Sequence, residues 1–399
     1  MMTRRCFASL AACASAPGAA DPRKTVAAIV TEYRYWSHAD VIVGRLLGGY
    51  SPNGVHQPPR TRVVSMYTDQ IAKQDMSRDL AARHGFRIYP SIEQALTLGG
   101  PRLAVDAVCF VGEHGDYPVN DVGQKLYPRY ELFTQILDVI ERSGRPVPCF
   151  FDKHLSYSWE KASKIWERVK RLKIPFLCGS SVTLTARTPP LEIPIGTPIR
   201  NAVAIGSGDL DAYGFHLLES AQCMLERRQG GETGVASVEW IEGRGAIDRW
   251  KAGEGAWVQP LWEEAVKRSG EPPQTDGGGR EPVLFLVNYR DGVNLAAFMM
   301  PRSGNGRVFA AREKGSSAVL STSFGPATRG RPLPHFDGLA YCIEELFTTG
   351  KALNPPERTV LTTGALSFLF ESRRARRRID TPELSIAYRA PEKAWVQTS

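Results

Sequence analysis

Three segments of this 399-residue chain carry side chains that can donate and accept protons. They are residues 113–117 (EHGDY), 152–154 (DKH) and 209–219 (DLDAYGFHLLE). The chemistry open to such side chains is general acid–base catalysis. Lys153 can act as a base where burial or a positive neighbour lowers its pKa. The other interpretation of Lys153 is a salt bridge within its own loop.

These segments have to be positioned by the alternating strands and helices that we expect between residues 25 and 185. Such alternation predicts right-handed crossovers and a parallel sheet. In an open parallel sheet, ligands bind outside the carboxyl ends of the strands, where residues 113–117 and 152–154 would lie. The predicted strands are TVAAIV, RVVSMYT, RIYP, DAVCFVG, VPCFF and IPFLCG, and the predicted helices are 38–49, 76–84, 91–97, 128–142 and 158–172.

The alternation of predicted strands and helices ends near residue 185, and the apolar stretches that follow are separated by Gly, Pro and Asn. GVASVEWIE, VLFLVNY, NLAAFMMP, RVFAARE and SAVLSTSF predict an antiparallel sheet. The fold class that follows is α/β, a Rossmann-type parallel-sheet domain followed by an α+β domain with a large, mostly antiparallel sheet. We place the first domain at residues 21–185 and the second at 186–390, with its last helices packing back and a tail at 391–399.

Several segments resemble the glucose-fructose oxidoreductase and inositol dehydrogenase (Gfo/Idh/MocA) family in their order and spacing. Asp152-Lys153-His154 stands where the family has a Glu-Lys-Pro loop before a helix. The stretches AARHGFRIYPSIEQAL, GDLDAYGFHLLESAQCML and ELFTTGKALNPPERTVLTTGALSFLFESRR resemble further family segments. Together the resemblance covers most of residues 25 to 390.

The resemblance implies hydride transfer between NAD or NADP and a hydroxyl of a sugar or cyclitol. Lys153 and His216 match the family's catalytic lysine and histidine, and the competing interpretation of His216 is a satisfied histidine in a packed helix. Ala212 occupies the position of a usual family Asp, so Asp211 is its expected substitute. Changing Lys153 to Met should alter stability little, because the stem still packs. The open face of the second sheet should form a homo-oligomer.

The loop after the first strand departs from the family pattern. A dinucleotide site needs a glycine-rich turn at a helix N-terminus, but residues 31–38 (TEYRYWSH) contain no glycine. Bulky side chains and Glu32 occupy the space of a diphosphate, while the helix end that Ser37 and Asp40 cap could still bind an anion. The residues expected at the cofactor are Tyr33, Ser37, His38, Asp69, Glu113 and His114.

Two other functions fit the same residues. One is a metal-assisted lyase, isomerase or hydrolase, using His114, His154 and His216 with Glu113, Asp116, Asp152 and Asp211. These residues lack a metal-binding spacing such as HExxH, and we therefore expect no metal. The other is a non-redox relative that binds carbohydrate, in which the aromatic residues of TEYRYWSH stack on a sugar ring.

The first 20 residues read as an export signal. Arg4 and Arg5 precede an alanine-rich stretch with an Ala-x-Ala-like site at residues 16–20, which is the form of a short twin-arginine signal and predicts a periplasmic protein. A lipid anchor at Cys13 and a cytoplasmic location are the alternatives. No stretch is long and apolar enough to span a bilayer.

Composition excludes little beyond nucleic-acid binding. The net charge of +8 includes five arginines between residues 373 and 378, a run at a predicted helix end without an accompanying reader motif. We therefore expect no nucleic-acid partner. The cysteines after the signal show no CxxC pair and are expected to be buried free thiols.

Overall fold

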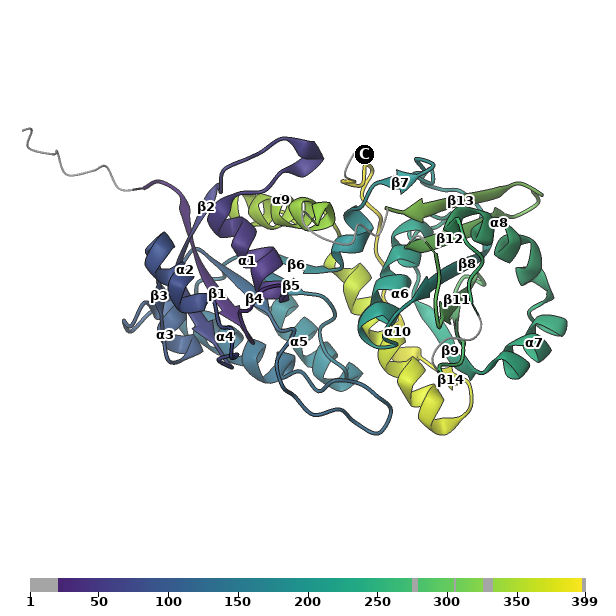
Figure 1. Cartoon of the computed structure of the whole chain (residues 1–399), viewed down its shortest axis with the longest axis horizontal. Coiled ribbons are helices and arrows are strands. Elements are labelled where there is room, and N and C mark those ends of the chain that lie inside the picture. Colours follow the sequence, from purple (N-terminus) through teal and green to yellow (C-terminus); the bar gives the residue numbers. More distant parts are fainter. Residues whose placement is uncertain (1–20, 275–278, 305, 326–332, 397–399) are drawn as a thin grey trace, which may run out of the picture.

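The computed structural model describes residues 21–274, 279–304, 306–325 and 333–396. The proposed export signal, with Arg4, Arg5 and Cys13, lies outside the described residues. Two sheets stand side by side, with the first at the purple end of the chain and the second at the green end (Figure 1).

The first sheet has the strand order β3-β2-β1-β4-β5-β6, and every neighbouring pair in it is parallel. This is the doubly wound Rossmann order, whose switch point lies between β1 and β4. Its strands are β1 (Lys24–Val30), β2 (Thr61–Thr68), β3 (Arg87–Ile88), β4 (Ala107–Val111), β5 (Cys149–Asp152) and β6 (Phe176–Gly179).

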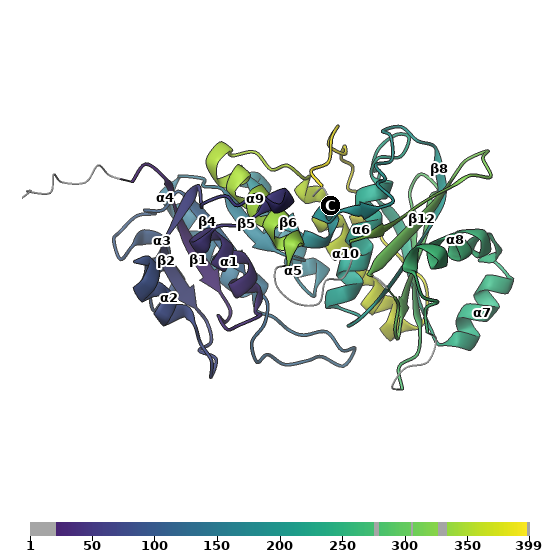
Figure 2. The same ribbon diagram turned by 45° about the horizontal axis from the view of Figure 1, so that its top comes forward.

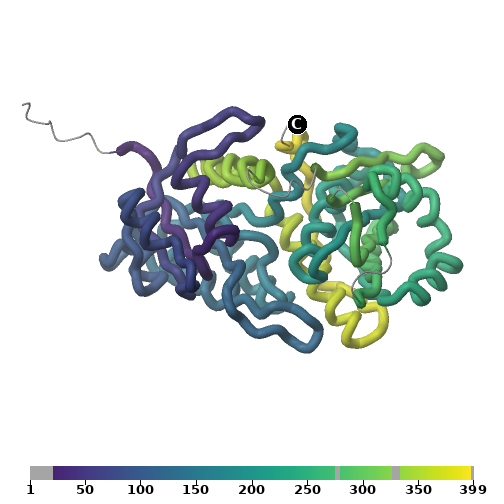
Figure 3. Tube along the Cα trace, in the orientation of Figure 1, coloured from purple at the N-terminus to yellow at the C-terminus, as the bar shows by residue number. Residues whose placement is uncertain are grey.

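Helices cover both faces of this sheet. One face is packed by α3 (Ile92–Thr97), α4 (Arg129–Ser143) and α5 (Trp159–Arg171). The other is packed by α1 (His38–Gly48), α2 (Ser77–His84) and α9 (Pro334–Thr349), a helix that returns from far along the chain (Figures 1 and 3). Amphipathic spacing and side-chain caps explain these helices, because Ser37, Ser91 and Ser158 each accept an amide hydrogen of the first turn.

The second sheet has the order β14-β9-β10-β11-β8-β12-β13-β7, and its pairs are antiparallel except for β8 with β11. The fold class expected from the sequence is therefore confirmed. The strands are β7 (Arg187–Thr188), β8 (Ile199–Ser207), β9 (Val235–Glu242), β10 (Val283–Tyr289), β11 (Asn294–Met300), β12 (Arg307–Glu313), β13 (Val319–Phe324) and β14 (Ile379–Asp380).

One face of the second sheet packs on α6 (Ala212–Leu225) and α10 (Pro356–Ala375), which lie between the two sheets (Figure 2). The opposite face is covered by α7 (Arg244–Ala252) and α8 (Gln259–Ser269), whose Ile247, Leu261 and Ala265 pack against Val203 and Phe298. The expectation of an open sheet face was wrong, because α7 and α8, which the sequence patterns did not predict, pack on it. A homo-oligomer through that sheet stays a proposal.

The described cysteines are free and buried, as expected. Among the described residues, no helix combines the length and apolarity that crossing a membrane requires.

Candidate functional site

A cavity of about 390 Å³ lies at the carboxyl ends of the first sheet's strands, where the second domain meets them. Its volume is near the low end of the range of about 300–1,000 Å³ that is usual for small-molecule sites. It brings together Lys153, His216, His38, Glu113 and His114 of the predicted site residues. The remaining lining includes Trp36, Ser181, Tyr213, Arg307, His335 and Phe336.

Three residues of this wall adopt a backbone conformation that is unusual for side chains other than glycine. Trp36, Lys153 and His114 have φ values of 65°, 54° and 71°. Left-handed conformations of this kind cost free energy and persist where the surrounding structure holds them, often at binding and catalytic sites. Their clustering at one cavity supports its choice as the candidate site.

A buried ion-pair network forms the floor of the cavity. Glu113, which is 5% exposed, accepts hydrogen bonds from Lys153 Nζ at 2.5 Å and from Arg129 Nη2 at 2.8 Å. Burial alone would raise the pKa of Glu113, but the positive charges of Lys153 and Arg129 hold that pKa well below its usual value. Lys153 is thus the partner of a buried carboxylate, an arrangement that suits a hydrogen-bond donor better than a proton acceptor.

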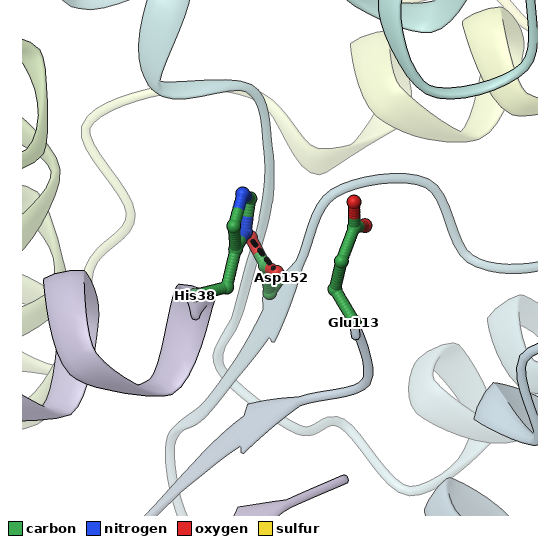
Figure 4. A group of neighbouring side chains, drawn as sticks. All are labelled: His38, Glu113 and Asp152. Atoms are coloured by element: carbon green, nitrogen blue, oxygen red, sulfur yellow. Dashed lines mark hydrogen bonds and ion pairs between the residues drawn. The ribbon is translucent and has the colours of Figure 1, made fainter. Parts of the chain in front are cut away.

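His38 and Asp152 form a dyad at the rim of this network. His38, the first residue of α1, places Nδ1 2.7 Å from Asp152 Oδ2, at the end of β5 (Figure 4). The carboxylate is 1% exposed. A carboxylate that accepts the Nδ1 hydrogen fixes the tautomer of the imidazole and leaves Nε2 as the proton acceptor. The sequence analysis assigned His38 to the cofactor and did not foresee this pairing.

Two further histidines of the wall are neutral at neutral pH. Burial lowers the pKa of His114 to about 4. Its Nδ1 accepts the backbone N–H of His38 at 3.2 Å, so its hydrogen is on Nε2. Burial also lowers the pKa of His216 well below its usual value, with further lowering by Lys153 and Arg307.

The Nδ1 atom of His216 lies 2.5 Å from Ser180 Oγ. That hydroxyl oxygen accepts the amide hydrogen of Val182, so its own hydrogen can point at the imidazole. His216 would then also present Nε2–H. His114 and His216 are therefore suited to donate hydrogen bonds to an oxygen of a ligand.

Asp211 does not line the cavity. It lies just before α6 and is 4% exposed, with Oδ1 3.6 Å from His154 Nε2. Burial raises the pKa of this carboxyl to about 7. Asp211 is therefore not placed to contact a ligand in the cavity, as a substitute for the family's Asp would be, because its side chain faces the buried His154.

The residues proposed for a metal site do not come together as expected. Among the described residues, the one group of three or more potential ligands is His38, Glu113 and Asp152, whose ligand atoms lie within 4.8 Å of one another (Figure 4). The Asp152 oxygen already accepts from His38, and Glu113 already has two cationic partners. Hydrogen bonds and ion pairs thus satisfy this group.

A dinucleotide diphosphate would bind at the N-terminus of α1. Side chains of the protein itself already accept hydrogen bonds from backbone amides there. The His38 amide donates to His114 Nδ1, the Asp40 amide to Ser37 Oγ at 3.3 Å, and the Trp36 amide to Asp40 Oδ2 at 2.9 Å. Free amides of this kind are what would bind a phosphate. The Asp40 carboxylate accepts the hydrogen of one of these amides, that of Trp36, instead.

The acidic residue expected at the ribose is also hydrogen-bonded within the protein. Asp69 accepts the hydroxyl hydrogens of Tyr67 at 3.0 Å and Tyr117 at 2.7 Å. Gln70 exchanges two hydrogen bonds with the Asp116 backbone, so the loop after β4 is fastened across the loop after β2. Tyr33 lies fully buried against a different cavity, between α1 and α9. The residues expected to hold NAD or NADP therefore do not fit a dinucleotide bound in the Rossmann manner.

We predict that neither NADH nor NADPH stabilises the protein. A ligand that binds only the folded state at 100 times its Kd contributes about 2.7 kcal/mol and raises the melting temperature. Differential scanning calorimetry at millimolar cofactor should show no rise, with an NAD-binding dehydrogenase run alongside as the positive control. A melting temperature that climbs with NADH concentration would contradict the misfit of the α1 N-terminus.

The fold is similar, over nearly the whole chain, to solved structures of Gfo/Idh/MocA-family oxidoreductases. Two solved structures illustrate it, each of which is similar over nearly its whole length. GenD2 from gentamicin A biosynthesis, in complex with NAD, has 12% identity and a TM-score of 0.55 over 92% of this chain and 99% of its own. The myo-inositol 2-dehydrogenase of Lactobacillus plantarum has 9% identity and a TM-score of 0.54, over 90% and 99%.

One of the structural neighbours is not named as an enzyme. The super-repressor mutant of Gal80p from Saccharomyces cerevisiae has 8% identity and a TM-score of 0.54, over 91% of this chain and 99% of its own. No protein-family model matches the sequence, and neither does any curated protein. At identities this low the comparisons establish the shared fold alone, and the Gal80p match shows that the fold is not restricted to proteins named as enzymes.

Proposed function

We propose that the cavity binds a small polyhydroxylated molecule, a sugar or cyclitol, and moves protons on it without nicotinamide. The observation that carries this proposal is the His38–Asp152 dyad, whose free Nε2 shares a cavity with the donors of Lys153 and His114. The myo-inositol dehydrogenases among the structural neighbours support the substrate class. The aromatic residues Trp36 and Tyr213, which are 37% and 48% exposed at the cavity, support it independently.

The reaction that suits this arrangement is proton abstraction from a carbon next to a carbonyl group. His38 Nε2 takes the proton, the electron pair of the C–H bond forms a double bond to the carbonyl carbon, and the π pair of the carbonyl moves onto its oxygen. The ammonium of Lys153 and the N–H groups of His114 and His216 are placed to stabilise the negative charge on that oxygen. Returning the proton to the same or a neighbouring carbon gives an epimerisation or an isomerisation.

Hydride transfer between NAD or NADP and a sugar hydroxyl is the function that the family resemblance implies. GenD2 shares the fold and is in complex with NAD. In this chain such a reaction would require the hydrogen bonds of Asp40, His114 and Tyr117 to be given up. We therefore prefer acid–base chemistry, which uses the described side chains as they stand.

The proposal is tested by hydrogen exchange. The protein is incubated in D₂O with a panel of aldoses, ketoses and keto-inositols, and the carbon-bound hydrogens are followed by proton NMR. We expect one class of sugar to raise the melting temperature and to lose a C–H signal. A panel that neither shifts the melting temperature nor exchanges would overturn the proposed function.

We also propose, from the sequence alone, that the chain is exported through Arg4 and Arg5. Changing both to Lys should leave the protein in the cytoplasm of a bacterial host, because the twin-arginine pathway requires the paired arginines. Cell fractionation and immunoblotting measure this, with Arg23→Lys as a control outside the signal. An unchanged distribution between fractions would remove this idea.

A further inference from the structure

Arg307 is a cation of the cavity wall that has no anionic partner among the described residues. It begins β12 and lies in the second domain, opposite the floor formed by Glu113 and Lys153. Within the described part of the chain, no carboxylate oxygen is within 4.0 Å of its guanidinium, and no hydrogen bond from that group is present. The guanidinium lies over the ring of Tyr213, with its carbon 5.5 Å from the ring centroid.

The surroundings of Arg307 show that its charge is poorly solvated. Burial lowers the pKa of Arg307 to about 10, although the group remains charged at neutral pH. Burial and the charges of Arg45 and Arg307 lower the pKa of His335 to about 4. A wall where cations disfavour further protonation has a positive potential, and an anion placed there would relieve it.

Charge counting over the cavity wall points to a single negative charge. Glu113 is the one carboxylate among the described lining residues, and the buried Asp152 of the dyad adjoins it. These two negative charges balance the positive charges of Lys153 and Arg129. Arg307 therefore leaves one positive charge uncompensated. A guanidinium matches a carboxylate through two parallel hydrogen bonds, whereas a phosphate monoester carries about −1.5 to −2 charges at neutral pH.

We infer that the substrate of this cavity is a sugar acid and that Arg307 binds its carboxylate. The inference rests on the proposed function, because it assigns the substrate class of the same site. Tyr213 and Trp36 would contact the ring or carbon chain, while the hydroxyl and carbonyl end faces Lys153 and the His38–Asp152 dyad. Arg307 is a binding residue in this arrangement and takes no part in proton transfer.

The experiment is a comparison of matched acidic and neutral ligands by isothermal titration calorimetry. The pairs are D-glucuronate with D-glucose, D-galacturonate with D-galactose, and D-gluconate with D-glucitol, and D-glucose 6-phosphate is the dianionic probe. We expect an acid to bind wild-type protein about 10- to 100-fold more tightly than its neutral partner, the range for hydrogen bonds to a charged group.

Variants assign the preference to the guanidinium. Arg307→Met should abolish the preference for the acid, and Arg307→Lys should retain part of it, because the charge stays and the fork is lost. The control is Lys314→Met, which removes an exposed positive charge just beyond β12 and outside the cavity. Thermal melts establish that each variant is folded.

The possible failures are distinguishable. Equal binding of the acidic and neutral partners by wild-type protein would overturn the role of Arg307 and leave the proposed function standing. A preference that survives in Arg307→Met, or a stronger preference for glucose 6-phosphate than for the carboxylates, would also overturn the inference. Wild-type protein that binds no member of this panel would overturn the inference, and if it also binds none of the ketoses and keto-inositols of the exchange panel, the proposed function falls with it.

Discussion

Replacing His38 by Asn is expected to slow sugar C–H exchange by about 10² to 10⁴, the usual contribution of a positioned general base. Asparagine is close to histidine in size, and its amide can still donate a hydrogen bond to Asp152. It cannot accept a proton. Binding of the sugar should change much less than exchange, because Arg307, Lys153 and the aromatic residues remain. The measurements are the NMR exchange rate and the calorimetric Kd on the same sample.

The matched control for this variant is His56→Asn, a histidine that lies away from the cavity in the loop before β2. It should exchange at the wild-type rate. Asp152→Asn should resemble His38→Asn, because an amide at this position can donate to the imidazole and stabilise the wrong tautomer. Exchange that continues undiminished in His38→Asn would exclude the dyad as the base and leave the proton transfer to another residue.

Local sequence patterns were enough to predict the elements that build the cavity. The strands of the first sheet are apolar runs, and the serine caps at Ser37, Ser91 and Ser158 locate three helix starts. Because carboxyl ends of neighbouring parallel strands meet at one edge, the convergence of Glu113 and Lys153 could also be inferred. These features depend on periodicity and on sheet topology, both of which are encoded locally.

The pairings inside the cavity could not be predicted in this way. His38 and Asp152 are 114 residues apart, and their contact depends on two side-chain rotamers that no periodicity encodes. Arg307 reaches the wall only because β12 pairs with β8 in the second sheet. Asp211 lies close to the correct turn in sequence, yet the direction of its side chain separates it from the cavity.

The absence of glycine in residues 31–38 was the strongest sequence signal against a dinucleotide, and the structure shows how that loop is used. Thr31 donates its hydroxyl hydrogen to the Glu113 carbonyl at 2.7 Å, joining the loops after β1 and β4 at the switch point. Sequence alone showed that the loop was bulky. It could not show that polar groups of this loop form hydrogen bonds within the protein and are therefore not available to a cofactor.

Replacing Lys153 by Met is expected to destabilise the fold by about 3 kcal/mol. The sequence alone predicts little change, because methionine keeps most of the packing of the lysine stem. Lys153 is, however, 3% exposed and paired with a buried Glu113. Removing one partner of a buried ion pair typically costs about 3–5 kcal/mol, because the other charge is left buried. We expect the lower end of that range, since Arg129 still binds Glu113. The measurement is the free energy of unfolding in urea.

The control is Lys161→Met, which removes a lysine paired with Glu131 at the protein surface. Exposed pairs are worth about 0.2–1 kcal/mol, so this variant should unfold near the wild-type midpoint. Adding Glu113→Gln to Lys153→Met should not recover the lost stability, because it leaves the buried guanidinium of Arg129 without its carboxylate. Equal midpoints for Lys153→Met and wild-type protein would mean that the ion pair contributes nothing.

The pH dependence separates the lost ion pair from lost packing. The pKa of Glu113 is depressed in the folded protein, so its stabilisation is fully present above its unfolded pKa of about 4.3. It is lost as the pH falls through the lower folded pKa, where the carboxylate becomes protonated. Lys153→Met reduces this depression. The gap between variant and wild type should therefore be largest at neutral pH and should narrow below about pH 4, whereas a gap caused by packing would be the same at every pH.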